Sequence, residues 1–155
     1  MHKTDFNLKT FVIIVLITSI WVNASEVFRY FVLVMPMVKE YWNGLETVAN
    51  MNWTIFSIWG VWDTILTAMT VFLFWLYAQR FGNNNRSILI SATIAWIFLF
   101  VLYWIGAANM GYSDWSILWI TLPLSLFELI IANYIASKLY KRFDYAKSQN
   151  NRHSH

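Results

Sequence analysis

The sequence predicts an all-α membrane protein, a four-transmembrane-helix bundle whose N- and C-termini both lie in the cytoplasm. Three observations predict it: the composition is too poor in charge for a soluble domain, four apolar runs have the length of a membrane span, and basic residues gather on one side of those runs. Of the 155 residues, 59% are hydrophobic and 12% are charged, whereas soluble domains carry about 25% charged residues. Lipid therefore replaces water around most of this chain.

The four apolar runs define the predicted spans. A bilayer core about 30 Å thick needs roughly 20 helical residues, and a run of this kind satisfies its backbone in lipid only as a helix. The spans are expected at about 11–38, 53–78, 88–108 and 115–137. Residues 1–138 then form the membrane domain, and 139–155 a basic, partly disordered cytoplasmic tail. Asn52 and Asp114 precede the second and fourth runs and suit the N-cap position.

The distribution of lysine and arginine predicts the orientation. Of 11 such residues, Arg29 lies inside a span and Lys39 follows the first span, which leaves nine (11 − 2) on the side of the termini. These are Lys3, Lys9, Arg80, Arg86, Lys138, Lys141, Arg142, Lys147 and Arg152. Because cytoplasmic flanks carry the excess of basic residues, we expect both termini inside, in a bacterial inner membrane.

The basic tail admits two interpretations. From Lys138 to Tyr145, lysines and an arginine alternate with aromatic residues, a pattern that suits binding to anionic lipid headgroups. The same pattern is also an ordinary positive flank of a last span. The expected partner is therefore the bilayer, and no feature of the sequence suggests nucleic acid.

The N-terminal run has a rival interpretation as a cleaved signal peptide. Lys9, the apolar stretch Phe11–Ile20 and the residues Val22-Asn23-Ala24 together resemble a signal sequence cut before Ser25. Cleavage would leave three spans and an outward N-terminus. Against it, apolar sequence resumes at Phe31, and the bulky Trp21 lies beside the cleavage position. We therefore predict that the first span is retained.

The residue types exclude several chemistries. Cysteine is absent, which removes disulfides, thiol redox chemistry and thiolate metal sites. Histidine occurs at His2, His153 and His155, all in the tails, so the spans contain no imidazole for a haem or zinc ion. No lysine lies within an apolar run, which argues against a retinal Schiff base. We expect no metal and no cofactor.

Charged residues inside the spans are the candidates for function. Glu26, Arg29, Asp63 and Glu128 each cost about 2.5–3.5 kcal/mol at membrane depth on insertion scales, and such groups face the bundle interior. Small and hydroxylated residues share their helical faces. The predicted polar centre consists of Asn23, Glu26, Arg29, Asp63, Thr67, Ser125 and Glu128. The third span carries no charge, and we expect it to serve packing or to face lipid.

The balance of these charges leads to two opposing hypotheses. Three acids and one arginine would leave two uncompensated negative charges if all were ionised, so some acids must be protonated, hydrated or bound to a cation. Asp63 and Glu128 would then be the exchanging groups and Arg29 their counter-charge. Alternatively, Glu26 or Asp63 neutralises Arg29 while a protonated Glu128 bonds to Asn133 or the backbone, and the network only fixes helix register.

A short segment resembles a known enzyme family. Residues 25–31, Ser-Glu-Val-Phe-Arg-Tyr-Phe, are similar to a Glu-x-x-Arg-Tyr run within a span of the 3-hydroxyacyl-CoA dehydratases of fatty-acid elongation. That family places its catalytic tyrosine and glutamate on Tyr-Pro-x-Gly-x-x-x-Glu. Residues 122–128 have leucine in place of that tyrosine, no glycine and a spacing one residue shorter. The family's mechanism is therefore not transferred to this chain.

Three classes of function follow. The first is proton- or cation-linked translocation of a small solute through the polar centre, for which a homo-oligomer is expected because four helices make a thin wall around a pathway. The second is a membrane enzyme acting on a lipid or acyl substrate, with Glu128 as the acid. The third is a structural or accessory subunit of a membrane assembly. The catalytic residues of the second class are unknown.

Overall fold

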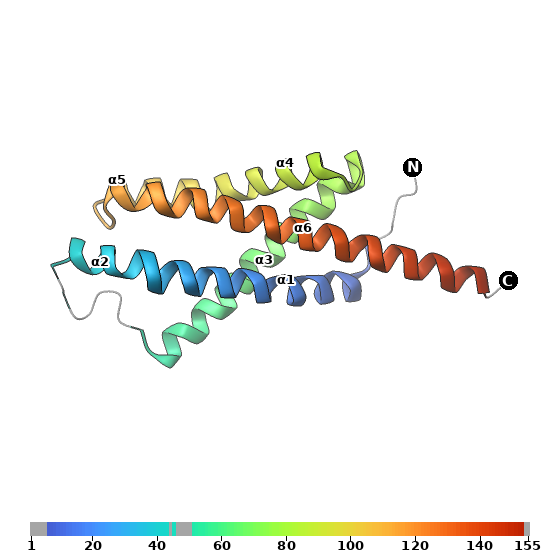
Figure 1. Cartoon of the computed structure of the whole chain (residues 1–155), viewed down its shortest axis with the longest axis horizontal. Coiled ribbons are helices and arrows are strands. Elements are labelled where there is room, and N and C mark those ends of the chain that lie inside the picture. Colours follow the sequence, from blue (N-terminus) through green and yellow to red (C-terminus); the bar gives the residue numbers. More distant parts are fainter. Residues whose placement is uncertain (1–5, 44, 46–50, 154–155) are drawn as a thin grey trace.

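The computed structural model describes residues 6–43, 45 and 51–153 and shows long helices running lengthwise beside one another (Figure 1). Within this part of the chain there is no strand, and four helices are long and apolar enough to cross a membrane. Their bounds are Leu8–Tyr41, Trp53–Phe81, Asn85–Asn109 and Trp115–His153. The predicted all-helical class and the four long apolar helices are therefore confirmed.

Two of the four helices contain a π-helical segment. The first consists of α1 (Leu8–Phe28), η1 (Arg29–Val34) and α2 (Met35–Tyr41), and the third consists of α4 (Asn85–Trp96), η2 (Ile97–Val101) and α5 (Leu102–Asn109), where η marks the π-helical part. The second and fourth are α3 (Trp53–Phe81) and α6 (Trp115–His153). Neither π-helical segment was predicted from the sequence.

The helices begin where their capping residues predict. The side chain of Asn52 accepts a hydrogen bond from the amide of Ile55 at 3.0 Å, and Asp114 accepts one from the amide of Ser116 at 2.7 Å. Both satisfy backbone donors that the first helical turn leaves without partners. The two predicted N-caps are thus confirmed. Asn84 begins α4 in the same way.

Large apolar side chains cover the outside of the bundle, and many polar side chains lie inside it, the reverse of a soluble protein. The helices pack in the cyclic order α1, α3, α4 and α6, with α3 and α6 also in contact across the bundle. Large side chains face outward on all four long helices, for example Ile20 with 71%, Trp62 with 67%, Phe98 with 66% and Phe127 with 59% of its surface exposed. Such a continuous apolar exterior suits lipid.

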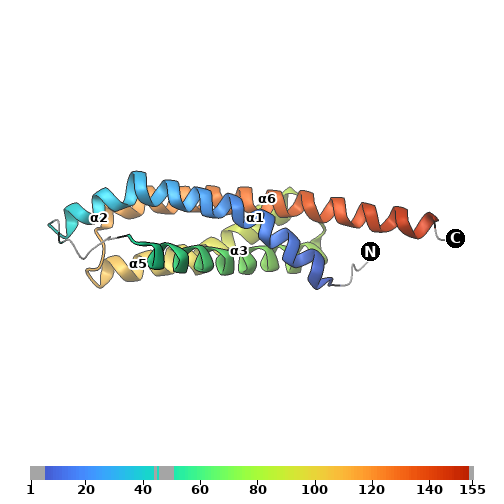
Figure 2. The same cartoon turned by 90° about the horizontal axis from the view of Figure 1, so that it is seen from below.

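The two ends of the bundle differ in what they contain. The start of α1, the turn between α3 and α4 and the C-terminal half of α6 lie at one end, and α2, α5 and the start of α3 lie at the other (Figures 1 and 2). Successive long helices therefore run antiparallel. The α6 helix also extends beyond the bundle at its C-terminal end (Figure 2).

The α6 helix is the longest of the four described. It has 39 residues and ends at His153, a length of about 58 Å at 1.5 Å per residue. No proline or glycine follows Pro123, so the helix propagates from its apolar part without forming a new first turn. The division into a membrane domain at 1–138 and a cytoplasmic tail at 139–155 stays a prediction.

The N-terminal segment is an integral part of the bundle. The α1 helix continues without interruption through Ser25, the position of the alternative cleavage site. Ile14, Val15 and Val22 are buried in the apolar core. Cleavage before Ser25 would remove these side chains from the core. Retention of this segment stays a prediction.

Candidate functional site

Arg29 forms the centre of a buried group of charged side chains. The residue is 5% exposed, and its guanidinium makes an ion pair with Glu26, one helical turn earlier. The guanidinium also donates a longer bond of 3.5 Å to the carbonyl of Thr121 on α6. Its Cζ lies 5.0 Å from the ring centroid of Phe100 on η2, within cation–π range. Two side chains and one backbone carbonyl, from three different long helices, therefore hold the charge in place.

Both π-helical segments contribute to this group. Arg29 is the first residue of η1, and Phe100, whose ring faces Arg29, belongs to η2. For η1 the sequence contains a cause, because Pro36 has no amide hydrogen to donate to the carbonyl of Val32. We have no physical account of η2 from the sequence. Single-turn π segments within α-helices occur frequently at functional sites, and two of them meet here.

Asp63 faces the ion pair from α3. It is 8% exposed and lies close enough to Glu26 and Arg29 to interact with both charges. The Thr67 hydroxyl donates to the carbonyl of Asp63 at 2.7 Å, so Thr67 lines the centre without bonding to the carboxylate. Among the described residues, the ion pair of Arg29 is with Glu26 and not with Asp63.

Asn23 marks a close approach of α1 and α3. Its amide nitrogen donates to the carbonyl of Ser19 at 2.8 Å. A Cβ built on Gly60 would lie 3.6 Å from the Oδ1 of Asn23, so the absence of a side chain at Gly60 brings α3 close to this position. Asn23 therefore belongs to the helix contact beside the charged group.

Glu128 is the most deeply buried charged residue described. It is 1% exposed, and neither carboxyl oxygen has a hydrogen-bond partner among the described residues. It lies within electrostatic range of Glu26, Arg29 and Asp63, and the Ser25 hydroxyl faces the carboxyl group as a potential donor, at longer range than the hydrogen bonds described above. The backbone carbonyl of Glu128 accepts a bond from the Trp21 indole at 3.2 Å. The side chain therefore belongs to the charged group but is not paired within it.

The expected bond between Glu128 and Asn133 is not formed. The amide nitrogen of Asn133 donates instead to the hydroxyl of Ser91 at 2.9 Å and to the carbonyl of Ile88 at 3.4 Å, both on α4. The two residues are five positions apart on α6, which places them on different parts of the helix circumference. Of the two partners that the structural interpretation allowed, Asn133 bonds to α4, and the described backbone gives neither carboxyl oxygen of Glu128 a hydrogen bond.

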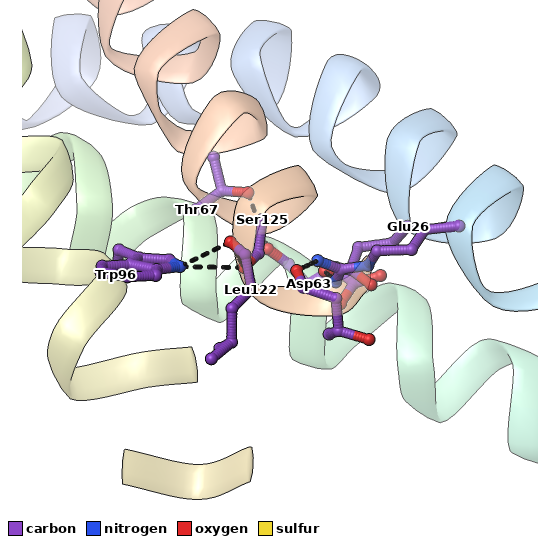
Figure 3. A network of polar contacts seen from close by, with 8 residues as sticks. Glu26, Asp63, Thr67, Trp96, Leu122 and Ser125 are labelled. Carbon is purple, nitrogen blue, oxygen red and sulfur yellow. Dashed lines mark hydrogen bonds and ion pairs between the residues drawn. The ribbon is translucent and has the colours of Figure 1, made fainter. Parts of the chain in front are cut away.

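The third long helix contacts the polar centre through an indole. The indole of Trp96 on α4 donates to the hydroxyl of Ser125 at 3.1 Å and to the carbonyl of Leu122 at 2.9 Å. Ser125 itself donates to the same carbonyl at 3.0 Å. Figure 3 shows Trp96, Ser125 and Leu122 beside Asp63 and Thr67. The third span was expected to serve packing or to face lipid, and this hydrogen bond adds a polar contact to its packing against α6. The signal in the sequence was an indole donor on a face with small residues.

The site as a whole has more negative groups than positive ones. One guanidinium faces three carboxyl groups, and Glu26 already takes part in the ion pair. Asp63 and Glu128 are left without an ion pair of their own in the part of the chain that the structure describes. An ionised carboxylate without a partner in low dielectric costs several kcal/mol. Such a site favours the uptake of a proton or of another cation.

The side chains do not form a familiar metal or cofactor site. No group of three or more histidine, cysteine, aspartate or glutamate side chains within the described residues is arranged to hold a metal ion. The polar partners available to a guest at this site are carboxyl, hydroxyl and indole groups. These suit protons, water and small polar solutes better than transition metals, which prefer imidazole and thiolate ligands.

Comparison with other proteins adds no relative to this description, since no protein-family model, curated protein or solved structure matches the chain. The resemblance of residues 25–31 to the dehydratases is therefore limited to those seven positions. Any assignment of function depends on the geometry of the buried charged group.

Proposed function

We propose that the protein is an integral membrane protein that links the passage of a small solute to the exchange of a proton or cation at its buried charged group. The observation that carries the proposal is Glu128, which is 1% exposed and has two carboxyl oxygens without hydrogen-bond partners among the described residues. A carboxyl group that is neither exposed nor paired is uncommon in a stable interior, and at membrane depth such groups commonly serve proton or ion relays.

The proposed orientation places both termini in the cytoplasm, with the bilayer being a bacterial inner membrane. At the bundle end that contains the start of α1 and the α3–α4 turn (Figure 1), the chain carries Lys9, Arg80 and Arg86, and α6 adds further basic residues toward its C-terminal end. The opposite end has Lys39. This asymmetry supports the orientation through the positive-inside rule, and the basic end would lie against anionic headgroups.

Within the proposal each member of the charged group has a separate role. Glu128 and Asp63 bind and release the exchanging ion, and Arg29 supplies a fixed positive charge, held by Glu26 and by the carbonyl of Thr121. Binding of one cation at Glu128 changes the net charge of the interior by one unit. Two conformations in which Glu128 lies at different distances from Arg29 would respond to this change of charge by different amounts. Such a difference in stability is what couples ion exchange to the movement of a solute.

Asn23, Thr67 and Ser125 would line the route beside the charged group. Each donates to a backbone carbonyl of its own helix, and Ser125 also accepts from the Trp96 indole. Because an amide or hydroxyl oxygen has two lone pairs, each retains capacity to accept a bond from a passing guest. We also propose a homo-oligomer, because four helices form a thin wall around this centre and a second copy would cover the partly exposed side of Glu26.

The test is a current measurement on proteoliposomes adsorbed to a solid support. Wild-type protein is exposed to pools of amino acids, amines, sugars and organic acids at fixed pH, and the proton-dependent current is recorded. We expect one pool to produce a current that Asp63→Asn and Glu128→Gln abolish. Glu40→Gln is the matched control, because Glu40 is exposed on α2 outside the charged group.

The outcomes separate the three classes of function. Full current in both site variants would refute the assignment of Asp63 and Glu128. Turnover of a lipid or acyl substrate by the purified protein, with no current, would favour a membrane enzyme. Absence of both, with one partner protein co-purifying in fixed stoichiometry, would favour an accessory subunit.

A further inference from the structure

Buried polar groups continue from Glu128 to one end of the bundle. They lie on facing sides of α6, α4, α1 and α3, and each is at most 2% exposed: Thr18, Thr67, Thr70, Ser87, Ser91, Asn133 and Ser137. They lead toward the α3–α4 turn, the end at which α1 begins (Figure 1). This file of polar side chains has no counterpart in the apolar exterior of the helices.

Hydrogen bonds connect the outer half of this file to the surface. Asn133 donates to the hydroxyl of Ser91 at 2.9 Å, and Ser91 donates to the carbonyl of Ser87 at 2.6 Å. The Ser87 hydroxyl donates in turn to the carbonyl of Gly82 at 2.6 Å and lies 3.3 Å from the Oδ1 of Asn84. Asn84 is exposed in the turn. A continuous series of polar contacts therefore joins the surface to Asn133.

The inner half of the file contains the polar atoms that lack partners. Between Asn133 and Glu128 the helix rises by about 7.5 Å over five residues. Arg29 contacts Thr121, and Trp21 contacts Glu128, on the antiparallel α6. Because α1 and α6 run antiparallel and Trp21 lies opposite Glu128, Thr18 lies opposite the part of α6 between Glu128 and Asn133.

Four buried oxygens in this interval have no hydrogen-bond partner among the described residues. They are both carboxyl oxygens of Glu128, the Thr18 hydroxyl and the Asn133 Oδ1. Two water molecules at ordinary hydrogen-bond spacing would span a rise of about 7.5 Å, and each would find the two or more polar partners that a buried water needs.

The opposite side of Glu128 is occupied by Arg29, whose guanidinium lies against Thr121. A guanidinium has hydrogen-bond donors and no acceptor, so it does not relay protons. The charged groups around Glu128 are Glu26, Arg29 and Asp63. Access to Glu128 from the end of the α3–α4 turn meets no such positive charge among the buried residues described.

We propose that the ion exchanged at Glu128 is a proton, and that it reaches the carboxyl group from the α3–α4 turn along a hydrated file past Asn133 and Thr18. Water and the hydroxyl groups of Thr18, Ser91 and Ser87 both donate and accept hydrogen bonds, so each of them can take a proton on one side and release one on the other. The Asn133 amide and the backbone carbonyls do not pass protons; they hold the hydroxyl groups and the water in line. A metal ion would need converging oxygen ligands, and the described carboxylates do not converge in that way. This inference rests on the proposed function only in treating Glu128 as the exchanging group.

The test is the rate of hydrogen–deuterium exchange at the Glu128 carboxyl group, measured by infrared spectroscopy. The carbonyl stretch of a protonated carboxyl shifts on deuteration, and the band of Glu128 is the one that disappears in Glu128→Gln. Protein in liposomes is transferred to D₂O buffer and the shift is followed in time. The readout does not involve a solute, so it can fail or succeed independently of transport.

Two isosteric variants form a matched pair on either side of Glu128. Thr18→Val and Thr121→Val each remove a buried hydroxyl that has no partner among the described residues, so neither loses a hydrogen bond on which folding depends. We expect Thr18→Val to slow exchange about tenfold, the equivalent of about 1.4 kcal/mol for one lost hydrogen-bond step. Asn133→Leu should slow it at least as much, whereas Thr121→Val should leave the rate unchanged.

Three results would overturn the inference. The first is the absence of a protonated-carboxyl band that depends on Glu128. The second is wild-type exchange in both Thr18→Val and Asn133→Leu. The third is slowing in Thr121→Val equal to that in Thr18→Val, which would place the entry of protons on the side of Arg29.

Discussion

Replacement of Glu128 by glutamine separates a functional carboxyl group from a structural one. Glu128 is 1% exposed and its side chain has no hydrogen bond or ion pair among the described residues. Glutamine has the same shape and retains an acceptor oxygen for the Ser25 hydroxyl, and it never carries a negative charge beside Glu26 and Asp63. We expect the melting temperature of Glu128→Gln to equal or exceed that of the wild type, as is common where a group is kept for function.

A structural role for Glu128 predicts a large fall in the melting temperature of Glu128→Gln. If Glu128 were ionised and paired with Arg29, its neutralisation would leave a buried arginine with one carboxylate fewer and cost about 3–5 kcal/mol. For a chain of this size, 1 kcal/mol corresponds to a shift of about 2–4 °C. The melting temperature would then fall by roughly 6–20 °C, well beyond experimental error.

Glu26→Gln provides the internal control. Glu26 holds the ion pair with the buried Arg29, so the same chemical change at Glu26 should lower the melting temperature by the full amount, roughly 6–20 °C. Both variants are followed in detergent by intrinsic tryptophan fluorescence. A fall in Glu128→Gln as large as that in Glu26→Gln would refute the reasoning and make the polar centre structural.

Four further predictions test other parts of the structure. Trp96→Phe removes the indole donor to Ser125 and should destabilise the protein by about 1–2 kcal/mol, measured by chemical denaturation in detergent; an unchanged midpoint would contradict the bond. Gly60→Ala adds a Cβ in ordinary van der Waals contact and improves helix propensity by up to about 1 kcal/mol, so its melting temperature should not fall, whereas Gly60→Leu should separate α1 from α3. Hydrogen bonds from Ser116 lower the pKa of the Asp114 carboxyl. The stabilisation from this cap is therefore fully present above the unfolded pKa of about 3.9 and is lost as the pH falls through the lower pKa of the folded protein. The melting temperature of Asp114→Ala should lie below that of the wild type at neutral pH, and the difference should disappear in acid. The intact mass of the purified protein should include the segment before Ser25, and a chain that begins at Ser25 would end the four-span description.

The sequence alone determined the number of long helices, their approximate ends and the identity of the buried charges. These properties are local. A run of about 20 apolar residues specifies a span by its length, and an asparagine or aspartate before such a run specifies a cap. A charged residue within the run is expected to face the bundle interior, whichever way the neighbouring helices are rotated. Asn52, Asp114 and Glu128 were recognised in this way.

The length of α6 shows what local rules do not specify. The apolar run predicts a span to about residue 137, and the helix itself continues to His153. A helix that is already nucleated extends through residues that would not begin one by themselves. The composition of a segment does not contain this information, because the cause is the structure of the preceding span.

Only the tertiary structure decided which polar groups meet. Glu26 rather than Asp63 pairs with Arg29, Asn133 bonds to Ser91 rather than to Glu128, and Trp96 joins the site from a helix without charges. Each outcome depends on the rotation of a helix about its axis and on its height relative to its neighbours. Packing of the whole bundle sets these two quantities, and no local pattern of residues specifies them.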